Sequence, residues 1–183
     1  GNEQLFYHLK MHHGLCLSIF HQSSKTNQHV ERGWVQISIV IPVHNEADNI
    51  VPLLNEIIAV LKSAKAYEII VVDDGSTDLT GQVLAQSLRD FAALRVLQHE
   101  HSCGQSTAVH TGVKAAFYPA SATLDGDGQN DPADIPRLFD VLMQQGNLGN
   151  LWMVAGWRNK RHDSAWKLFS SKFANTVRST LLG

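Results

Sequence analysis

The sequence has few cysteines, and this scarcity excludes a fold held together by a disulfide framework. Only two cysteines, Cys16 and Cys103, occur among the 183 residues, and they lie far apart in the chain. Small secreted domains that depend on disulfides carry several cysteines at close spacing. The two thiols therefore favour a reducing compartment, and the sequence predicts a cytoplasmic location.

Long hydrophobic runs and an excess of charge are also missing. No run of about 18 apolar residues is present, which is the length that a membrane-spanning helix requires. The formal net charge of -2 argues against nucleic acid as a partner bound through overall positive charge. With 44% hydrophobic and 17% charged residues, and no internal repeat, the chain is long enough for one domain with an apolar core.

The first 34 residues carry no pattern that assigns them to an element. An apolar-leaning stretch over residues 5–20 is interrupted by Lys10 and Gly14, which does not fit the apolar core of a signal peptide. The rest of this region is rich in His, Gln, Ser and Asn and has no clear period. We therefore divide the chain into an unassigned leader or extension over 1–34 and a domain over 35–183.

Strand patterns alternate with helix patterns from residue 37 onward. β-Branched and apolar runs predict strands at 37–41, 68–72, 94–97, 122–124 and 152–155. Apolar spacings of three and four, or helix start patterns, predict helices over 46–61, from about 77 to 88, over 104–117, from 131 and over 164–182. This alternation indicates an α/β fold with a mostly parallel sheet and helices on both faces.

Two of the predicted helices have a plausible capping residue. Asn45 precedes the first helix, with Glu46 and Asp48 in the first turn, where the helix dipole favours negative charge. Asp131 precedes Pro132 at another helix start, and Pro is favoured at the first helical position. We expect both side chains to cap these helices.

Polar clusters directly follow three of the predicted strands, at residues 42–46, 73–76 and 125–129. In open α/β sheets ligands bind outside the carboxyl ends of the strands, so the clusters are expected to meet at one crevice. Asp125 and Asp127 flank a glycine, which allows a tight backbone and the approach of a large anion. Their hard oxygens suit Mg2+ or Mn2+, although an Asp-Gly turn with solvated acids is the alternative.

These clusters, in this order and at these intervals, resemble the family 2 glycosyltransferases. The matching runs are residues 41–46 (IPVHNE), 71–78 (VVDDGSTD) and 125–132 (DGDGQNDP). Residues 156–158 (GWR) and 171–175 (SKFAN) are similar to the branch of dolichyl-phosphate mannosyltransferases and undecaprenyl-phosphate glycosyltransferases.

The resemblance covers residues 35–182, with two departures. Relatives commonly have an Asn where this chain has Ser102. They also continue past the position equivalent to Gly183, so the domain is expected to be truncated at its C-terminal side.

The resemblance implies the GT-A fold, a Rossmann-like sheet flanked by helices, and a set of site residues. Pro42, Glu46 and Asp74 would contact the nucleoside of a UDP- or GDP-sugar, with Asp74 accepting from a base ring nitrogen. Asp125, Asp127 and Gln129 would hold Mg2+ or Mn2+ and the diphosphate. Arg158, and Lys167 in the basic stretch 157–178, would add positive contacts to the donor. The expected catalytic residues are Asp125, Asp127 and Arg158.

The implied reaction is sugar transfer, with inversion, from a nucleotide diphosphate sugar to a polyprenyl phosphate at the inner face of the membrane. The basic stretch 157–178 would suit an anionic acceptor or membrane surface, or it is a solvated helix face.

Several other interpretations stay open from the sequence. They are a nucleotide-sugar-binding fragment without turnover and a transferase to a saccharide hydroxyl. A nucleotidyltransferase would need a Gly-rich basic loop after the first strand, where this chain has His44 and Glu46. His99, His101 and Cys103 alternate as zinc ligands can, but no fourth ligand is evident.

Overall fold

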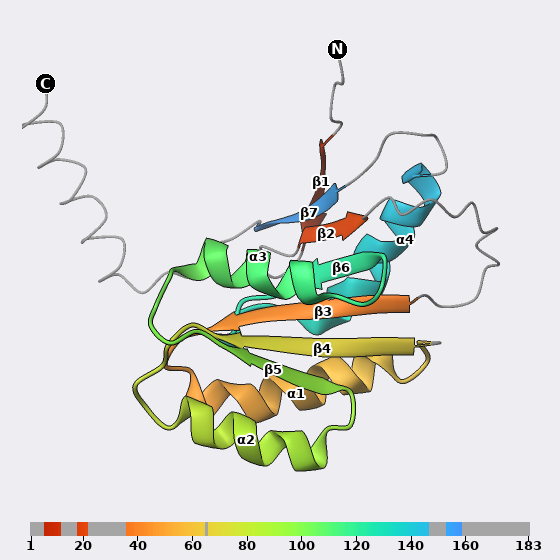
Figure 1. Cartoon of the computed structure of the whole chain (residues 1–183). Helices are drawn as coiled ribbons and strands as arrows, with labels where there is room; N and C mark the ends of the chain where they lie inside the picture. The colour runs from red at the N-terminus through yellow and green to blue at the C-terminus, as the bar shows by residue number, and fades with distance from the viewer. Residues whose placement is uncertain (1–5, 12–17, 22–35, 65, 147–152, 159–183) are drawn as a thin grey trace, which may run out of the picture.

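A computed structural model describes residues 6–11, 18–21, 36–64, 66–146 and 153–158. These residues form a seven-stranded sheet in the order β1-β7-β2-β6-β3-β4-β5, with helices on both of its faces (Figure 1). The strands are β1 (Phe6–Met11), β2 (Ser18–His21), β3 (Gln36–Val43), β4 (Ala66–Asp73), β5 (Leu94–Gln98), β6 (Ala120–Thr123) and β7 (Met153–Arg158). The helices are α1 (Ala47–Leu61), α2 (Thr80–Asp90), α3 (Gln105–Ala115), η1 (Pro132–Asp134) and α4 (Ile135–Gly146).

The sheet is mostly parallel, as the sequence predicted. β3 pairs in parallel with β4 and β6, and β4 pairs in parallel with β5. Only β2 runs against its neighbours, between β6 and β7, within the part of the chain that the structure describes. Because β3, β4 and β6 run the same way, the loops that follow them emerge at one edge of the sheet.

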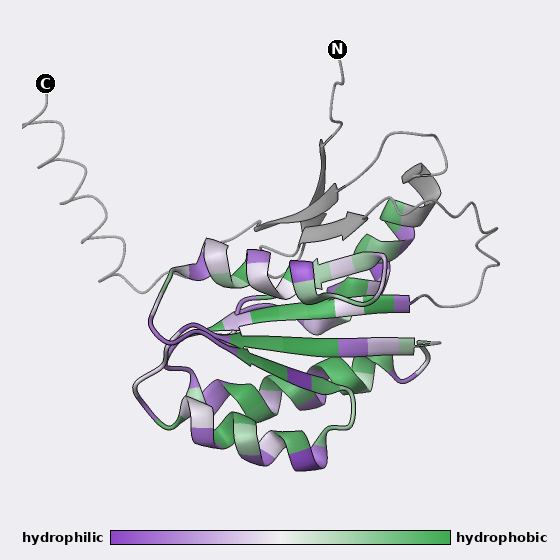
Figure 2. Ribbon diagram, viewed as in Figure 1, coloured by the Kyte–Doolittle hydropathy of each residue, from purple (hydrophilic) through white to green (hydrophobic). Residues whose placement is uncertain are grey.

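The central strands are buried because helices cover them on both sides. Ile39 of β3 and Ile69 of β4 are fully buried in a large apolar cluster that α1, α2 and α4 complete on one face. On the other face α3 places Ala108 against Ile70 and Val72. Figure 2 shows β3 and β4 as hydrophobic along most of their lengths, whereas the outward sides of the helices are more polar. This pattern is typical of a parallel sheet that is covered on both faces.

The two predicted helix caps have different outcomes. Asp131 accepts a hydrogen bond from Ala133 N at 2.9 Å, and Pro132 starts η1, so the expectation there is confirmed. The expectation for Asn45 is wrong, because α1 begins after Glu46 and has no side-chain cap at that position. Asn45 adopts a φ of 59°, and its Oδ1 accepts from Thr77 N at 2.8 Å. Its side chain therefore joins the loop after β3 to the loop after β4.

Two short strands come from the region that the sequence left unassigned. β1 pairs in parallel with β7, and β2 lies antiparallel between β6 and β7. The helix predicted over residues 164–182 lies outside the described residues. None of the helices in the described ranges has the length and hydropathy that crossing a membrane requires.

Candidate functional site

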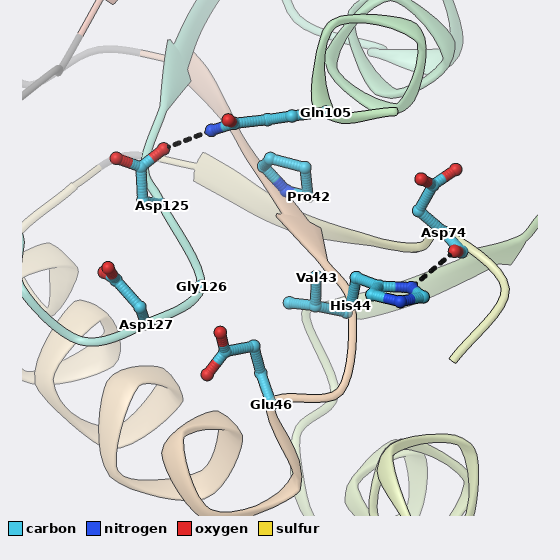
Figure 3. A pocket seen from close by; sticks show the side chains of 9 residues that line it. All are labelled: Pro42, Val43, His44, Glu46, Asp74, Gln105, Asp125, Gly126 and Asp127. Carbon is cyan, nitrogen blue, oxygen red and sulfur yellow. Dashed lines mark hydrogen bonds between the residues drawn. The ribbon is translucent and has the colours of Figure 1, made fainter. Parts of the chain in front are cut away.

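A cavity of about 270 Å³ opens at the edge of the sheet where β3, β4 and β6 end. The loops after these three strands and the start of α3 supply its walls (Figure 3). The lining residues are Pro42, Val43, His44, Glu46, Asp74, Gln105, Asp125, Gly126 and Asp127. The structure thus brings together the three polar clusters that the sequence predicted to meet.

Acidic side chains dominate this cavity. In Figure 3 the carboxylates of Glu46, Asp125 and Asp127 lie around the same part of the open space. Glu46 is held in place by Asn49, whose amide nitrogen donates to Glu46 Oε2 at 2.6 Å. None of the lining residues, all of which belong to the described part of the chain, is Lys or Arg. A diphosphate that entered the cavity would meet uncompensated negative charge unless a cation accompanied it.

The loop after β6 is packed tightly against the end of β3. A Cβ at Gly126 would lie 2.6 Å from Val43 Cγ1 and 3.0 Å from the carbonyl oxygen of Pro42. These contacts confirm that Gly126 allows a tight backbone, because a side chain there would meet both Val43 and the Pro42 carbonyl. The approach of an anion to Gly126 stays a prediction. The close packing fixes Asp125 and Asp127 on either side of Gly126.

The two acids of this loop differ in their surroundings. Asp125 is partly buried, and its Oδ1 accepts from Gln105 Nε2 at 2.6 Å. Asp127 is exposed, and its Oδ1 accepts from the backbone nitrogen of Gln129 at 3.0 Å. Both offer hard oxygen atoms to the cavity, which is the donor chemistry that Mg2+ and Mn2+ prefer.

One predicted site residue lies away from the cavity wall, and the structure does not describe the side chains of two others. Gln129 is exposed in the loop after β6, and it does not line the cavity. Arg158 is the last residue of β7, of which the structure describes the backbone. Lys167 lies outside the described residues. Their predicted roles remain predictions.

Asp74 lines the cavity but is itself buried, with only 3% of its surface exposed. Its Oδ1 accepts from His99 Nδ1 at 2.7 Å and from Cys103 N at 2.9 Å. Its Oδ2 accepts from Ser102 Oγ at 2.9 Å and from Gly104 N at 2.8 Å. This carboxylate is thus buried although it lies in a loop at the edge of the sheet.

These hydrogen bonds control the ionisation of Asp74. Burial by itself would raise the pKa of this carboxyl. The bonds from Cys103 N, His99, Ser102 and Gly104 N outweigh burial and lower the pKa well below its ordinary value of 3.8. Asp74 is therefore ionised at neutral pH although it is buried.

Asp74, His99 and Cys103 form a group whose possible ligand atoms lie within 4.8 Å of one another. The hydrogen bonds argue against a metal there. His99 Nδ1 donates to Asp74, and His99 Nε2 lies 3.0 Å from Thr111 Oγ, so both ring nitrogens are engaged. The group is better described as a hydrogen-bonded Asp74–His99 pair with a neighbouring thiol.

Two polar residues of the cavity had no predicted role. Gln105 is the first residue of α3, and sequence patterns give no reason to pair it with Asp125 twenty positions later. His44 donates from Nδ1 to the backbone oxygen of Asp74 at 2.8 Å. The position of His44 directly after a buried strand was the available indication that it borders the site.

The fold and this cavity define an α/β protein with an acid-lined cavity at the carboxyl ends of parallel strands, which is where open α/β sheets bind their ligands. Comparison with known proteins gives the family. Residues 38–177 match the family described as Glycosyl transferase family 2, so the chain belongs to this family. The mostly parallel sheet agrees with the GT-A fold that the motifs implied.

Curated relatives are about a third identical to this chain over the residues that align. Dodecaprenyl-phosphate galacturonate synthase of Rhizobium johnstonii is 36% identical over 152 residues, which cover 81% of this chain and 43% of that protein. Undecaprenyl-phosphate 4-deoxy-4-formamido-L-arabinose transferase of Pseudomonas paraeruginosa is 36% identical over 141 residues. These residues cover 76% of this chain and 40% of that protein. The chain thus spans less than half the length of these relatives.

Among solved structures, glucosyl-3-phosphoglycerate synthase from Mycobacterium tuberculosis in complex with Mn2+, uridine-diphosphate and glucosyl-3-phosphoglycerate is 27% identical. That match covers 58% of this chain and 40% of the synthase, with a TM-score of 0.48.

Proposed function

We propose that this chain is the donor-binding part of a glycosyltransferase that moves a sugar from a UDP- or GDP-sugar to a polyprenyl phosphate. The single observation that carries the proposal is the acid-lined cavity at the ends of β3, β4 and β6. The family match and the two curated relatives, both named for transfer to a polyprenyl phosphate, support it. Action at the inner face of the membrane, close to such a lipid acceptor, is part of the same proposal.

The donor would lie in the cavity with its nucleoside against the loop after β3. Pro42, Glu46 and Asp74 are the residues that we assign to nucleoside contact, because all three line the cavity. Asp125 and Asp127, with Gln129 from the same loop, would hold Mg2+ or Mn2+ against the diphosphate. Arg158 and Lys167 would add positive contacts to the donor.

When bound, the cation would stabilise the negative charge that develops on the departing nucleoside diphosphate. The chain's acids supply the opposite charge that holds it. The oxygen of a polyprenyl phosphate is already ionised at neutral pH, so its attack needs no general base. Attack from the face opposite the leaving group would give inversion at the anomeric carbon.

Calorimetry with UDP- and GDP-sugars tests whether donor binding requires a divalent metal ion. We expect binding in Mn2+ or Mg2+ and a loss of at least about tenfold in affinity when EDTA is added. Asp127→Asn should reproduce the EDTA result, because it removes one of the acids at the diphosphate. Asp140→Asn, which changes an exposed acid on α4, is the matched control and should bind as the wild type does. Equal affinity with and without EDTA would remove the metal from the proposal.

A transfer assay tests the acceptor. Radiolabelled nucleotide sugars are offered with undecaprenyl or dolichyl phosphate, and in parallel with soluble saccharides. Label in the lipid phosphate is the expected outcome. Transfer to saccharide alone would defeat the lipid-phosphate assignment, and transfer to neither by a chain that binds the nucleotide would favour a binding-only function.

A further inference from the structure

Asn45 connects the two loops that form one wall of the cavity. Its Oδ1 accepts from Thr77 N at 2.8 Å and from Asp78 N at 3.3 Å. Its own backbone nitrogen donates to Ser76 Oγ at 2.9 Å. The paired strands β3 and β4 end directly before these loops, so the hydrogen bonds of the sheet stop there. Beyond the sheet, Asn45 continues the connection between the loop after β3 and the loop after β4.

The other end of the Asn45 amide faces the ring of His44. Asn45 Nδ2 lies 3.2 Å from His44 Nε2, and His44 Nδ1 lies 2.8 Å from the backbone oxygen of Asp74, as Figure 3 shows. A carbonyl oxygen can only accept, so Nδ1 carries a proton and donates. In a neutral ring Nε2 is then the acceptor, and the amide of Asn45 donates to it. One orientation of this amide therefore satisfies both His44 and Thr77.

We propose that Asn45 is a positioning residue for the nucleoside of the donor. It holds the ring of His44 with the proton on Nδ1, and it fixes the loop after β3 against the loop after β4. Asn45 is not one of the residues that line the cavity, so it acts through its neighbours. This inference rests on the proposed function, which assigns Pro42, Glu46 and Asp74 to nucleoside contact.

Hydrogen bonds on either side of Asn45 extend this connection to the residues that line the cavity. On one side, Val43 O accepts from Asp74 N at 2.8 Å. On the other side, Glu46 N donates to Thr80 Oγ1 at 2.9 Å, at the first residue of α2. None of the hydrogen bonds of Asn45, whose partners all belong to the described part of the chain, reaches the loop after β6. Asn45 therefore acts on the nucleoside side of the cavity and not on the acids assigned to the metal.

The backbone of Asn45 explains why an asparagine suits this position. Its φ of 59° lies in the left-handed region, which most side chains rarely adopt and which Asn and Asp tolerate better. Gly would keep this conformation and lose the whole amide. Asp would keep an acceptor for Thr77 N and lose the donor to His44. The two contacts of the side chain can thus be tested separately.

The binding experiment compares Asn45→Gly with the wild type by calorimetry with UDP and GDP, in Mn2+ and then in EDTA. We expect affinity in Mn2+ to fall about tenfold, because the nucleoside wall loses its connection. The factor by which EDTA lowers affinity should stay as in the wild type, since the metal acids are untouched. Asn55→Ala, which changes an exposed asparagine of α1, is the matched control and should bind as the wild type does.

Two results of this experiment would overturn the positioning role. They are an unchanged affinity in Asn45→Gly and a loss of the EDTA effect in that variant. A wild-type chain that binds neither nucleotide would instead defeat the proposed function.

A ligand-free measurement follows the ring of His44 directly. In the 15N-labelled chain at about pH 8, where imidazole rings are neutral, nitrogen chemical shifts distinguish a proton on Nδ1 from one on Nε2. The signals that disappear in His44→Gln belong to this ring, and in the wild type they should show the proton on Nδ1. Asn45→Asp should move a proton onto Nε2, because a carboxylate only accepts, whereas Asn55→Ala should leave the signals unchanged. A wild-type ring with its proton on Nε2, or unchanged signals in Asn45→Asp, would overturn the inference.

Discussion

Gly126 sets how closely the loop after β6 can approach β3. Because its Cβ would lie 2.6 Å from Val43 Cγ1, Gly126→Ala must push the loop or the end of β3 aside. Overpacking of this kind costs about 1–3 kcal/mol. We expect a loss of that size in the free energy of unfolding, measured by denaturant titration, together with weaker nucleotide binding.

Gly81→Ala is the matched control for this prediction. Gly81 lies in the first turn of α2, and its nearest neighbours would be 3.8 Å and 3.9 Å from the added Cβ, which is ordinary contact. This variant should be neutral or more stable, since Ala favours a helix over Gly. If the two substitutions had the same effect on stability, close packing at Gly126 would not be the cause.

At the scale of single residues, the sequence indicated which residues lie near the cavity but not what their side chains contact. Asp74 follows a strand, so its position at the sheet edge was predictable. Its donors lie 25 to 30 positions later, in a segment whose path no local pattern defines. Asn45 was misjudged for the same reason, because its partner Thr77 lies across the site on another loop.

At the scale of elements, the sequence predicted those strands and helices whose own residue pattern identifies them. The β-branched run in β3 and the apolar stripe of α1 need no knowledge of their partners to be recognised. β1 and β2 are short and have no clear period, and their place depends on pairing with β7 and β6. Pairing of strands so distant in sequence has no local pattern to predict it.

A buried network joins β3, β4 and the segment after α3 at the opposite edge of the sheet. Ser38 is fully buried and donates to Glu68 Oε1 at 2.6 Å, and it accepts from Tyr118 N at 3.2 Å. Ser38→Ala removes both bonds and leaves the backbone nitrogen of Tyr118 without this acceptor. We expect the free energy of unfolding to fall by about 1–3 kcal/mol, measured by denaturant titration.

The comparison variant for this element is Ser87→Ala in α2. Ser87 is also buried, at 2% exposed, but its hydroxyl bonds only to the Val83 carbonyl one turn earlier. Such back-bonding contributes little to helix stability, so the effect should stay well below that of Ser38→Ala. If Ser38→Ala and Ser87→Ala lowered the free energy of unfolding equally, the hydrogen-bond network of Ser38 would contribute no stability beyond that of a buried serine.

At the scale of the whole molecule, two buried carboxylates hold the two ends of β4. Glu68 lies near the start of the strand and Asp74 directly after its end. Burial alone would raise the pKa of Glu68, but bonds from Ser38, Phe117 N and Arg95, with the charge of Arg95, lower it below its ordinary value of 4.5. The pKa of Asp74 is lowered in the same sense. Both groups therefore stabilise the folded chain in the ionised state.

Their lowered pKa values predict how stability depends on pH. In the unfolded chain Glu68 and Asp74 take up protons near their ordinary pKa values of 4.5 and 3.8. In the folded chain they take up protons at lower pH. Between the unfolded and folded pKa values the unfolded state binds more protons, so the free energy of unfolding falls as pH falls. The stabilisation is complete above about pH 5 and is lost below it, with a slope of at most about 1.4 kcal/mol per pH unit for each group.

Denaturant titrations between pH 7 and pH 3 measure this slope. Glu68→Gln and Asp74→Asn should each lower stability at pH 7 and flatten the fall below pH 5, because each removes one group that protonates on unfolding. Glu56→Gln, at an exposed position of α1, serves as the control and should retain the wild-type slope. If both buried variants kept that slope, other groups would be responsible for acid unfolding.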